Sequence, residues 1–195
     1  MAAGHKLRVM LVDDDAERLS MLEQALTAEG HSIAARLDTH ADLPSAVERC
    51  QPEVIFIDVD APGRDTLESL GQLNRQHPRP IVLFAARSDA ETTRRAVHAG
   101  VSAYVVDGLH PTRLSSLMEV AIARFELHQA LRHELDQART RLADQRDIEK
   151  AKGLLMKRRG LDEAAAYGLL RRMAMDRKQR IGDFARVLIT AADVL

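Results

Sequence analysis

Residues 54–60 read Val-Ile-Phe-Ile-Asp-Val-Asp, a run of four apolar residues that leads directly into a carboxylate. An apolar run without polar alternation is typical of a strand buried on both faces, as in a parallel sheet. Further strands are predicted at residues 7–12, 32–37, 81–85 and 103–106. Because helical patterns separate these strands, the sequence predicts a flavodoxin-like, doubly wound α/β domain with a five-stranded parallel sheet.

Carboxylates follow two of the predicted strands. Asp13 and Asp14 come after residues 7–12, and Asp58 comes after residues 54–57. Ligands of doubly wound sheets bind at the carboxyl ends of the strands, so we expect these three side chains to converge. An oxygen-rich site of this kind suits Mg²⁺, and a carboxylate can also accept a phosphoryl group. The sequence therefore predicts an acidic pocket for Mg²⁺.

The pattern changes after Pro111. Neither Gly nor Pro occurs between Thr112 and Lys152, so about 40 residues can form a single helix. Apolar residues recur along it at alternating steps of three and four, interrupted by Arg124 and His128. The apolar positions are Leu114, Leu117, Ala121, Leu131, Leu135, Ala138 and Leu142. This heptad seam predicts a coiled-coil homodimer, with a lone solvated helix as the alternative.

The last segment has the pattern of a compact three-helix unit. The long helix is expected to end near Gly160, and Asp162 is expected to cap a second helix. A third helix is predicted over about residues 181–191. The chain is thereby divided into a domain core at residues 1–110, a coiled-coil connector at residues 111–147 and an all-α bundle at residues 148–195.

Charge is distributed unevenly along the chain. The whole sequence has 28 Lys and Arg against 29 Asp and Glu, and its net charge of −1 argues against a nucleic-acid partner. Residues 1–110, however, carry a net −6, residues 111–147 a net 0 and residues 148–195 a net +5. Clustered Lys and Arg bind phosphates without reading sequence, so the basic segment is a candidate nucleic-acid surface. A merely solvated basic hairpin is the alternative.

The composition excludes several classes of protein. The single cysteine, Cys50, leaves no pair for a disulfide and too few thiolates for a cysteine-rich zinc site. No apolar stretch approaches the ~18 residues of a membrane span. The first residues also lack the apolar region of a signal peptide, so we expect a cytoplasmic protein that does not contact a membrane.

The run Val12-Asp13-Asp14-Asp15, together with Asp58-Val59-Asp60-Ala61-Pro62-Gly63, resembles the receiver domain of bacterial response regulators. The resemblance spans residues 6 to about 125. It implies that Asp58 is the phosphoacceptor of a phosphorelay with a sensor kinase. It also implies that Asp13, Asp14 and Asp58 bind Mg²⁺ through their carboxylates and that Asp60 does so through its backbone carbonyl.

Two positions depart from the receiver pattern. Ala85 ends the fourth predicted strand, where receivers usually have Thr or Ser, and Asp107 stands where they usually have Lys. A phosphoryl group on Asp58 would lose a hydroxyl donor and a cation, each worth of order 1–3 kcal/mol. Regulation by a binding partner is therefore expected to be at least as important as phosphorylation.

Three blocks stand out in the basic segment: Ala151-Lys152-Gly153-Leu154-Leu155-Met156, Ala166-Tyr167 and Leu170-Arg171-Arg172-Met173-Ala174-Met175. They resemble the ANTAR domain, an RNA-binding module of transcription antiterminators. The resemblance implies binding to a two-hairpin leader RNA that competes with a terminator hairpin. It places Lys152, Arg171, Arg172 and Ala174 in the RNA-binding blocks. On their charge alone, we add Lys157, Arg177 and Lys178.

The order of the parts and the run Tyr104-Val105-Val106-Asp107-Gly108 resemble the NasT-type regulators of nitrate-assimilation antitermination. This resemblance implies a nitrate-sensing partner protein and control of nitrate and nitrite assimilation genes. Two alternatives are a phosphorylation-controlled DNA-binding transcription factor and a receiver-based protein-interaction regulator. Asp58-Val59-Asp60 is also similar to the nucleophile motif of haloacid-dehalogenase-type phosphatases, but Pro62 stands where these have Thr or Val. We therefore expect no enzyme activity.

Overall fold

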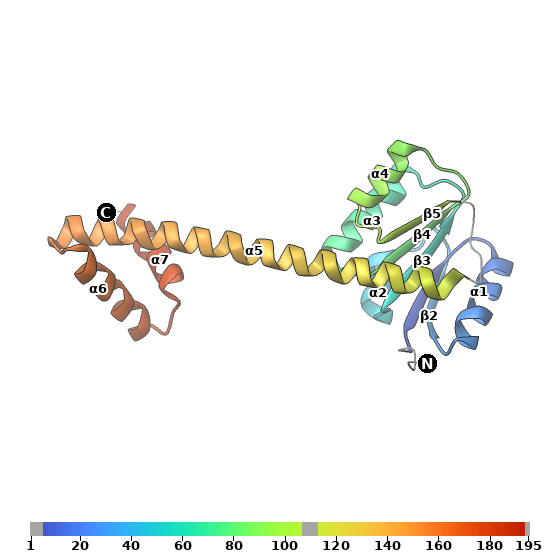
Figure 1. The fold of residues 1–195 in the computed structure, drawn as a ribbon, viewed down its shortest axis with the longest axis horizontal. Coiled ribbons are helices and arrows are strands. Elements are labelled where there is room, and N and C mark those ends of the chain that lie inside the picture. The colour runs from blue at the N-terminus through green and yellow to red at the C-terminus, as the bar shows by residue number, and fades with distance from the viewer. Residues whose placement is uncertain (1–5, 107–112, 194–195) are drawn as a thin grey trace. The chain divides into compact units, whose positions relative to one another are not determined.

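The structure, a computed structural model, describes residues 6–106 and 113–193 (Figure 1). Its first part contains β1 (Arg8–Val12), α1 (Ala16–Ala28), β2 (Ser32–Leu37), α2 (Leu43–Cys50), β3 (Val54–Val59), α3 (Arg64–Gln76), β4 (Ile81–Ala85), α4 (Ala90–His98) and β5 (Ala103–Val106). The long helix α5 (Leu114–Arg159), α6 (Glu163–Asp176) and α7 (Ile181–Asp193) follow. None of the described helices is long and apolar enough to cross a membrane.

The strands form one parallel sheet in the order β2-β1-β3-β4-β5, which confirms the predicted five-stranded doubly wound domain. Alternate residues of a strand point to opposite faces of the sheet. Met10 and Ile55 pack against α2, α3 and α4, whereas Leu11 and Phe56 pack against α1 and the first turns of α5. Both faces are therefore covered, which explains why the central strands are apolar throughout.

The strand order brings two distant segments of the chain together. β1 pairs with β3, and Val12 lies beside Ile57 in this ladder. Asp13 and Asp58, which come next in the sequence, therefore leave the sheet side by side at the carboxyl ends of the strands. This is the edge at which ligands of doubly wound domains bind.

The start of α5 belongs to the α/β unit. Leu114 and Ala121 are buried in the core beneath the sheet, and Leu117 is partly buried beside them. These turns lie within the predicted connector at residues 111–147, and their apolar side chains pack within their own chain. The sequence pattern alone does not distinguish the two environments, because a helix on a sheet and a coiled-coil helix both repeat apolar residues every three or four positions.

The apolar residues farther along α5 have a different environment. Leu131, Leu135 and Leu142 expose 56%, 49% and 57% of their surface, and Ala138 is exposed as well. None of the three apolar cores among the described residues includes them. This half of the seam remains open to a partner helix, and the homodimer remains a prediction.

The second compact unit begins at Gln129 and contains the predicted three-helix bundle. Gly160 follows α5 in the left-handed conformation (φ +64°). The side chain of Asp162 caps α6 by accepting a hydrogen bond from the Ala165 N–H at 2.7 Å, as predicted. The buried core of the unit consists of Ala151, Leu155, Ala166, Leu170, Ala174, Phe184 and Ala185.

Ion pairs and a glycine fix α7 against α5. Asp144 on α5 accepts hydrogen bonds from Arg180 at 2.9 Å and from Arg186 at 3.3 Å. Arg186 also donates to Asp147 at 3.0 Å. A Cβ atom on the buried Gly182 would overlap the Asp144 side chain, so this close approach requires glycine. The α5–α7 contact is therefore specified by charge and shape as well as by apolar packing.

Candidate functional site

The acidic pocket lies where β1 and β3 end. Asp13 is only 2% exposed and Asp58 only 7% exposed, so both carboxylates are largely withdrawn from water. Asp14 and Asp60 are exposed. The structure thus brings Asp13 and Asp58 together as predicted, whereas the other two predicted ligands, Asp14 and Asp60, have exposed side chains.

Arg18, a residue that the sequence patterns did not single out, lies in this pocket. Its Nη2 donates to Asp13 Oδ1 at 2.7 Å and its Nε donates to Asp13 Oδ2 at 2.8 Å, a two-pronged ion pair. The same Nε lies 3.7 Å from Asp58 Oδ2. Hydrogen bonding to Asp13 raises the pKa of the Arg18 guanidinium, which therefore stays charged. One cation thus serves both buried carboxylates.

The start of α1 places Arg18. The Asp15 side chain caps this helix by accepting hydrogen bonds from the N–H groups of Glu17 at 2.9 Å and Arg18 at 3.2 Å. Asp15 in turn donates its N–H to Asp13 at 2.9 Å. Arg18 consequently leaves the first turn of α1 directly beside the carboxylate that it binds. The sequence signal was an Arg in the first turn after an Asp run, but its target depends on the fold.

The remaining predicted metal ligands are also bonded within the protein. Both oxygens of Asp14 accept hydrogen bonds from Thr39, one from the backbone N–H at 2.9 Å and one from the hydroxyl at 2.6 Å. These bonds, chiefly the one from the hydroxyl, lower the pKa of Asp14. The Asp60 carbonyl accepts the N–H of Arg87 at 3.2 Å. The oxygens of Asp14 and Asp60 that are predicted to bind Mg²⁺ thus already accept hydrogen bonds from the protein.

The resemblance to receiver domains predicts Mg²⁺ in this acidic pocket, and the arrangement of the side chains bears on that prediction. Mg²⁺ needs near-octahedral oxygen ligands at about 2.0–2.1 Å. Across residues 6–106 and 113–193, no group of three or more acidic, His or Cys side chains is arranged to hold a metal ion. Asp13 is bonded to Arg18 instead. The side chains as they stand do not fit Mg²⁺.

The neighbouring positions bear on phosphoryl binding. Ala85 is fully buried at the end of β4 and offers no hydroxyl group. Asp107, the other departure from the receiver pattern, lies outside the described residues. Burial raises the pKa of Asp58, Arg18 opposes this shift, and the negative charges of Asp13, Asp60 and Asp15 add to it. Ionisation of Asp58 therefore costs free energy, because the side chain is buried and other carboxylates lie nearby.

We expect Asp58→Asn to stabilise the α/β unit at neutral pH. The pKa of Asp58 in the folded chain lies above its ordinary value of 3.8. Between these two pKa values the folded chain binds more protons than the unfolded chain, so its stability falls as the pH rises through this range. Removing the charge should raise the melting temperature at pH 7.5 by about 4 °C, or about 1 kcal/mol. The gain should vanish below the ordinary pKa. Thermal unfolding at pH 3.5 and 7.5 measures both, with the exposed Asp136→Asn as control; an equal gain at both pH values would contradict the assignment.

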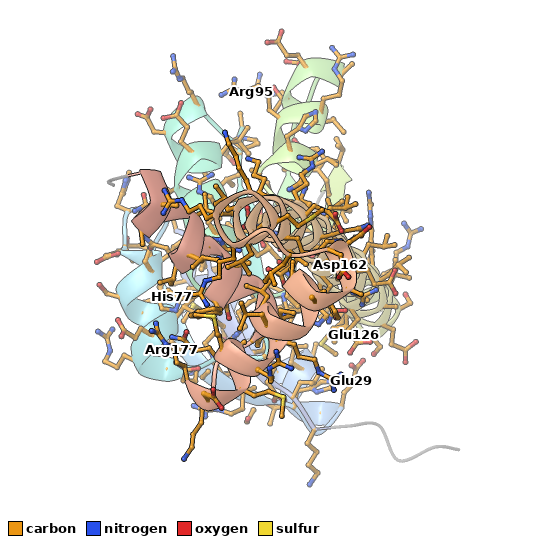
Figure 2. All side chains as sticks on the ribbon, turned by 90° about the vertical axis from the view of Figure 1, so that its left-hand side faces the viewer. Glu29, His77, Arg95, Glu126, Asp162 and Arg177 are labelled. Carbon is orange, nitrogen blue, oxygen red and sulfur yellow. The ribbon has the colours of Figure 1, made fainter. Side chains whose placement is uncertain are left out.

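The second site is a basic surface on the C-terminal bundle. Lys157 near the end of α5, Arg171 and Arg172 on α6, and Arg177 and Lys178 after α6 are all exposed. The guanidinium of Arg177, a residue labelled in Figure 2, lies 5.1 Å from the ring centre of Phe184, and this cation–π contact orients it. Five of the seven predicted RNA-binding residues are thus accessible to a phosphate.

The other two predicted RNA-binding residues, Lys152 and Ala174, are buried in the bundle. Lys152 is only 8% exposed, and its Nζ donates to Glu149 at 2.8 Å and to Glu163 at 2.7 Å. These hydrogen bonds raise the pKa of Lys152 and tie α5 to the start of α6. Ala174 is 2% exposed in the bundle core. Lys152 therefore contributes to bundle assembly and Ala174 to packing, and their part in RNA binding stays a prediction.

Two exposed residues on α6 add apolar surface beside the cations. Tyr167 and Met175 are 45% and 64% exposed and stand four residues before and after Arg171. Residues four apart share one face of a helix, so the three side chains form a single stripe. An exposed tyrosine next to an arginine can stack on an unpaired base. The i, i+4 spacing was legible in the sequence, but the exposure was not.

The sequence matches two protein families. Residues 9–119 match the family described as "Response regulator receiver domain", and residues 136–189 match the one described as "ANTAR domain". The transcriptional regulatory protein PdtaR of Mycobacterium tuberculosis is 30% identical over 182 residues, covering 93% of this chain and 89% of that protein. The protein-glutamate methylesterase/protein-glutamine glutaminase of Nitrobacter winogradskyi is 34% identical over 134 residues, 65% of this chain and 30% of that protein.

Solved structures resemble the α/β unit. A CheY-like response regulator receiver domain protein from Methanospirillum hungatei has a TM-score of 0.55 at 20% identity, over 64% of this chain and 99% of that one. NtrX from Brucella abortus has a TM-score of 0.52 at 25% identity, over 71% of this chain and 31% of that one. The likeness to the first of these shows the fold alone. The similarity to PdtaR, in contrast, covers nearly the whole chain.

Proposed function

The chain belongs to the response regulators that join a receiver domain to an ANTAR domain, and from this premise we propose that it is an RNA-binding transcription antiterminator. Both domains are regulatory and point to a non-enzymatic protein. The single observation that carries the proposal is the exposed basic surface of the C-terminal bundle, with Arg171 flanked by Tyr167 and Met175.

The chemistry of this surface suits a folded RNA with unpaired bases. Exposed Arg and Lys side chains neutralise phosphates, and aromatic and guanidinium planes stack on bases in loops. We propose a two-hairpin leader RNA as the ligand, bound so that the competing terminator hairpin does not form. Lys152 supports this surface from beneath by fixing α6 to α5 through Glu149 and Glu163.

Dimerisation through the exposed half of the α5 seam would give each regulator two RNA-binding bundles. Leu131, Leu135 and Leu142 supply the apolar residues, with Ala138 between them. Two linked modules bind two hairpins of one RNA with a raised effective concentration, so avidity exceeds the affinity of either bundle. This arrangement accounts for the pairing of a two-hairpin ligand with a single small module per chain.

The input to the receiver is proposed to be a protein partner rather than phosphorylation alone. The buried Ala85 offers no hydroxyl group to bond a phosphoryl group, and Arg18 is already paired with Asp13. The resemblance to NasT-type regulators favours a nitrate-sensing partner and nitrate or nitrite assimilation genes, with a sensor kinase as the second input.

The experiment that tests the function compares nucleic acids on the full chain. A synthetic RNA with two adjacent stem-loops should bind more tightly than either stem-loop alone and than duplex DNA of the same length. Single-round transcription across a terminator preceded by the two stem-loops should then show increased read-through when the protein is added. Preference for the duplex DNA would instead favour a DNA-binding transcription factor, and no binding to either would favour a protein-interaction regulator.

We expect Asp58→Ala to leave antitermination nearly intact, within about twofold of the unmodified protein. The substitution removes the phosphoacceptor carboxylate and leaves the exposed cations of the bundle unchanged. Read-through in the same transcription assay measures the effect, in the presence and absence of acetyl phosphate as a phosphodonor. Arg171→Ala is the matched loss-of-binding control. A complete loss of read-through in Asp58→Ala alone would show that phosphorylation controls the output.

A further inference from the structure

Arg18 is the one cation that the described structure places against the buried carboxylates at the ends of β1 and β3. We propose that Arg18 is a built-in counter-ion of the receiver that takes the place of a divalent metal ion in the acidic pocket. The receiver would thereby hold its conformation without Mg²⁺, and Mg²⁺ would bind only after displacing the guanidinium. The inference concerns the α/β unit and does not depend on RNA binding.

The geometry of the ion pair supports direct competition. Both oxygens of Asp13 accept hydrogen bonds from Arg18, at 2.7 and 2.8 Å. Two parallel charge-assisted bonds of this kind are the strongest arrangement available to a guanidinium and a carboxylate. A metal ion bound by Asp13 would need at least one of the same oxygens. The metal ion would bring a second positive charge close to the guanidinium, so electrostatic repulsion sets the two cations in competition for Asp13.

Burial makes a resident cation necessary. Asp13 and Asp58 are nearly inaccessible to water, and an uncompensated buried carboxylate is strongly unfavourable. Receivers usually have Lys after the fifth strand, but the corresponding residue of this sequence is Asp107. Arg18 supplies the compensating charge from α1 instead, and its 3.7 Å separation from Asp58 Oδ2 extends that compensation to the second carboxylate.

Arg18 can nevertheless leave the pocket. Its side chain is 38% exposed, and it extends from the first turn of α1, so rotation about its own side-chain bonds carries the guanidinium into solvent. The pocket is therefore occupied but not sealed. A ligand that requires the displaced state binds with an affinity reduced by the small population of that state. We accordingly expect weak Mg²⁺ binding that strengthens when Arg18 is removed.

Mg²⁺ titration of the full chain tests this inference, with MgCl₂ alone as the probe and isothermal calorimetry as the readout. Arg18→Ala should bind Mg²⁺ at least tenfold more tightly than the unmodified protein. Arg87→Ala is the matched control, because the Arg87 side chain is exposed and its backbone N–H, which the substitution keeps, bonds to the Asp60 carbonyl. The control should change the Mg²⁺ affinity less than threefold, since it removes a positive charge but leaves Arg18 bound to Asp13.

Equal Mg²⁺ affinity in the unmodified protein and Arg18→Ala would overturn the proposal, and so would an equal gain in Arg87→Ala, which would indicate general electrostatics. If Arg18→Ala folds only when MgCl₂ is added, circular dichroism will show that the metal replaces the guanidinium, as proposed. If it does not fold at all, Arg18→Lys decides. Lys keeps the charge but lacks the two-pronged geometry, so an intermediate Mg²⁺ affinity supports the proposal and an unchanged one contradicts it.

Discussion

Replacing Arg171 and Arg172 together with Ala is expected to weaken binding of a two-stem-loop RNA by about 10- to 100-fold at moderate salt. Both side chains are exposed on α6, and neither is needed for the bundle core. Each lost phosphate contact should also reduce the slope of log K against log salt by about 1. The double variant should therefore bind with a slope smaller by about 2.

Fluorescence anisotropy with the labelled RNA, at four salt concentrations, measures both the affinity and the slope. Arg49→Ala with Arg94→Ala is the matched control, because it removes the same charge from exposed positions of the α/β unit. The control should leave the salt slope unchanged. If the two double variants lose the same affinity, the effect belongs to the net charge of the chain and the basic surface is not the RNA site.

Phe184→Ala is expected to destabilise the C-terminal bundle by about 3–5 kcal/mol, a typical cost for removing a buried aromatic side chain. Phe184 is 1% exposed and is the largest side chain in the core of that unit. A small bundle has little stability in reserve, so this loss should unfold α6 and α7 at 37 °C. Arg177 would also lose the ring that orients it.

Circular dichroism and RNA binding on the full chain test this second prediction. The helical signal should fall and RNA binding should be lost, whereas Mg²⁺-independent folding of the α/β unit should persist as a separate thermal transition. Val187→Ala is the control on the same helix, since Val187 is about half exposed and should cost little stability. A Phe184→Ala variant with normal helicity and normal RNA affinity would show that the bundle core does not support the basic surface.

The sequence predicted the fold nearly completely, because its signals are local and redundant. The apolar runs of the central strands, the Asp162 cap of α6 and Gly160 after α5 each agree with the structure. Such agreement is expected where patterning, capping and turn residues all favour the same elements. The doubly wound class also predicted that Asp13 and Asp58 converge at the carboxyl ends of the strands, and the pairing of β1 with β3 places them side by side.

Side-chain environments were predicted less well. Lys152 and Ala174 lie in blocks that mark an RNA-binding module, yet one is ion-paired between two helices and the other is packed in a core. A block shared by a family combines residues that contact the ligand with residues that hold the module together. Burial separates the two groups, and burial depends on how α5, α6 and α7 pack.

The sequence by itself determined the strands, the helices, the division of charge and the presence of carboxylates at two strand ends. Each of these depends on residue type and spacing along the chain. Only the tertiary structure decided that Leu114 packs on the sheet, that Lys152 is withdrawn from the surface and that Arg18 fills the acidic pocket. These outcomes depend on which side chains meet across distant elements, and a guanidinium with several rotatable bonds can reach many partners. In this fold the guanidinium of Arg18 lies within hydrogen-bonding distance of Asp13.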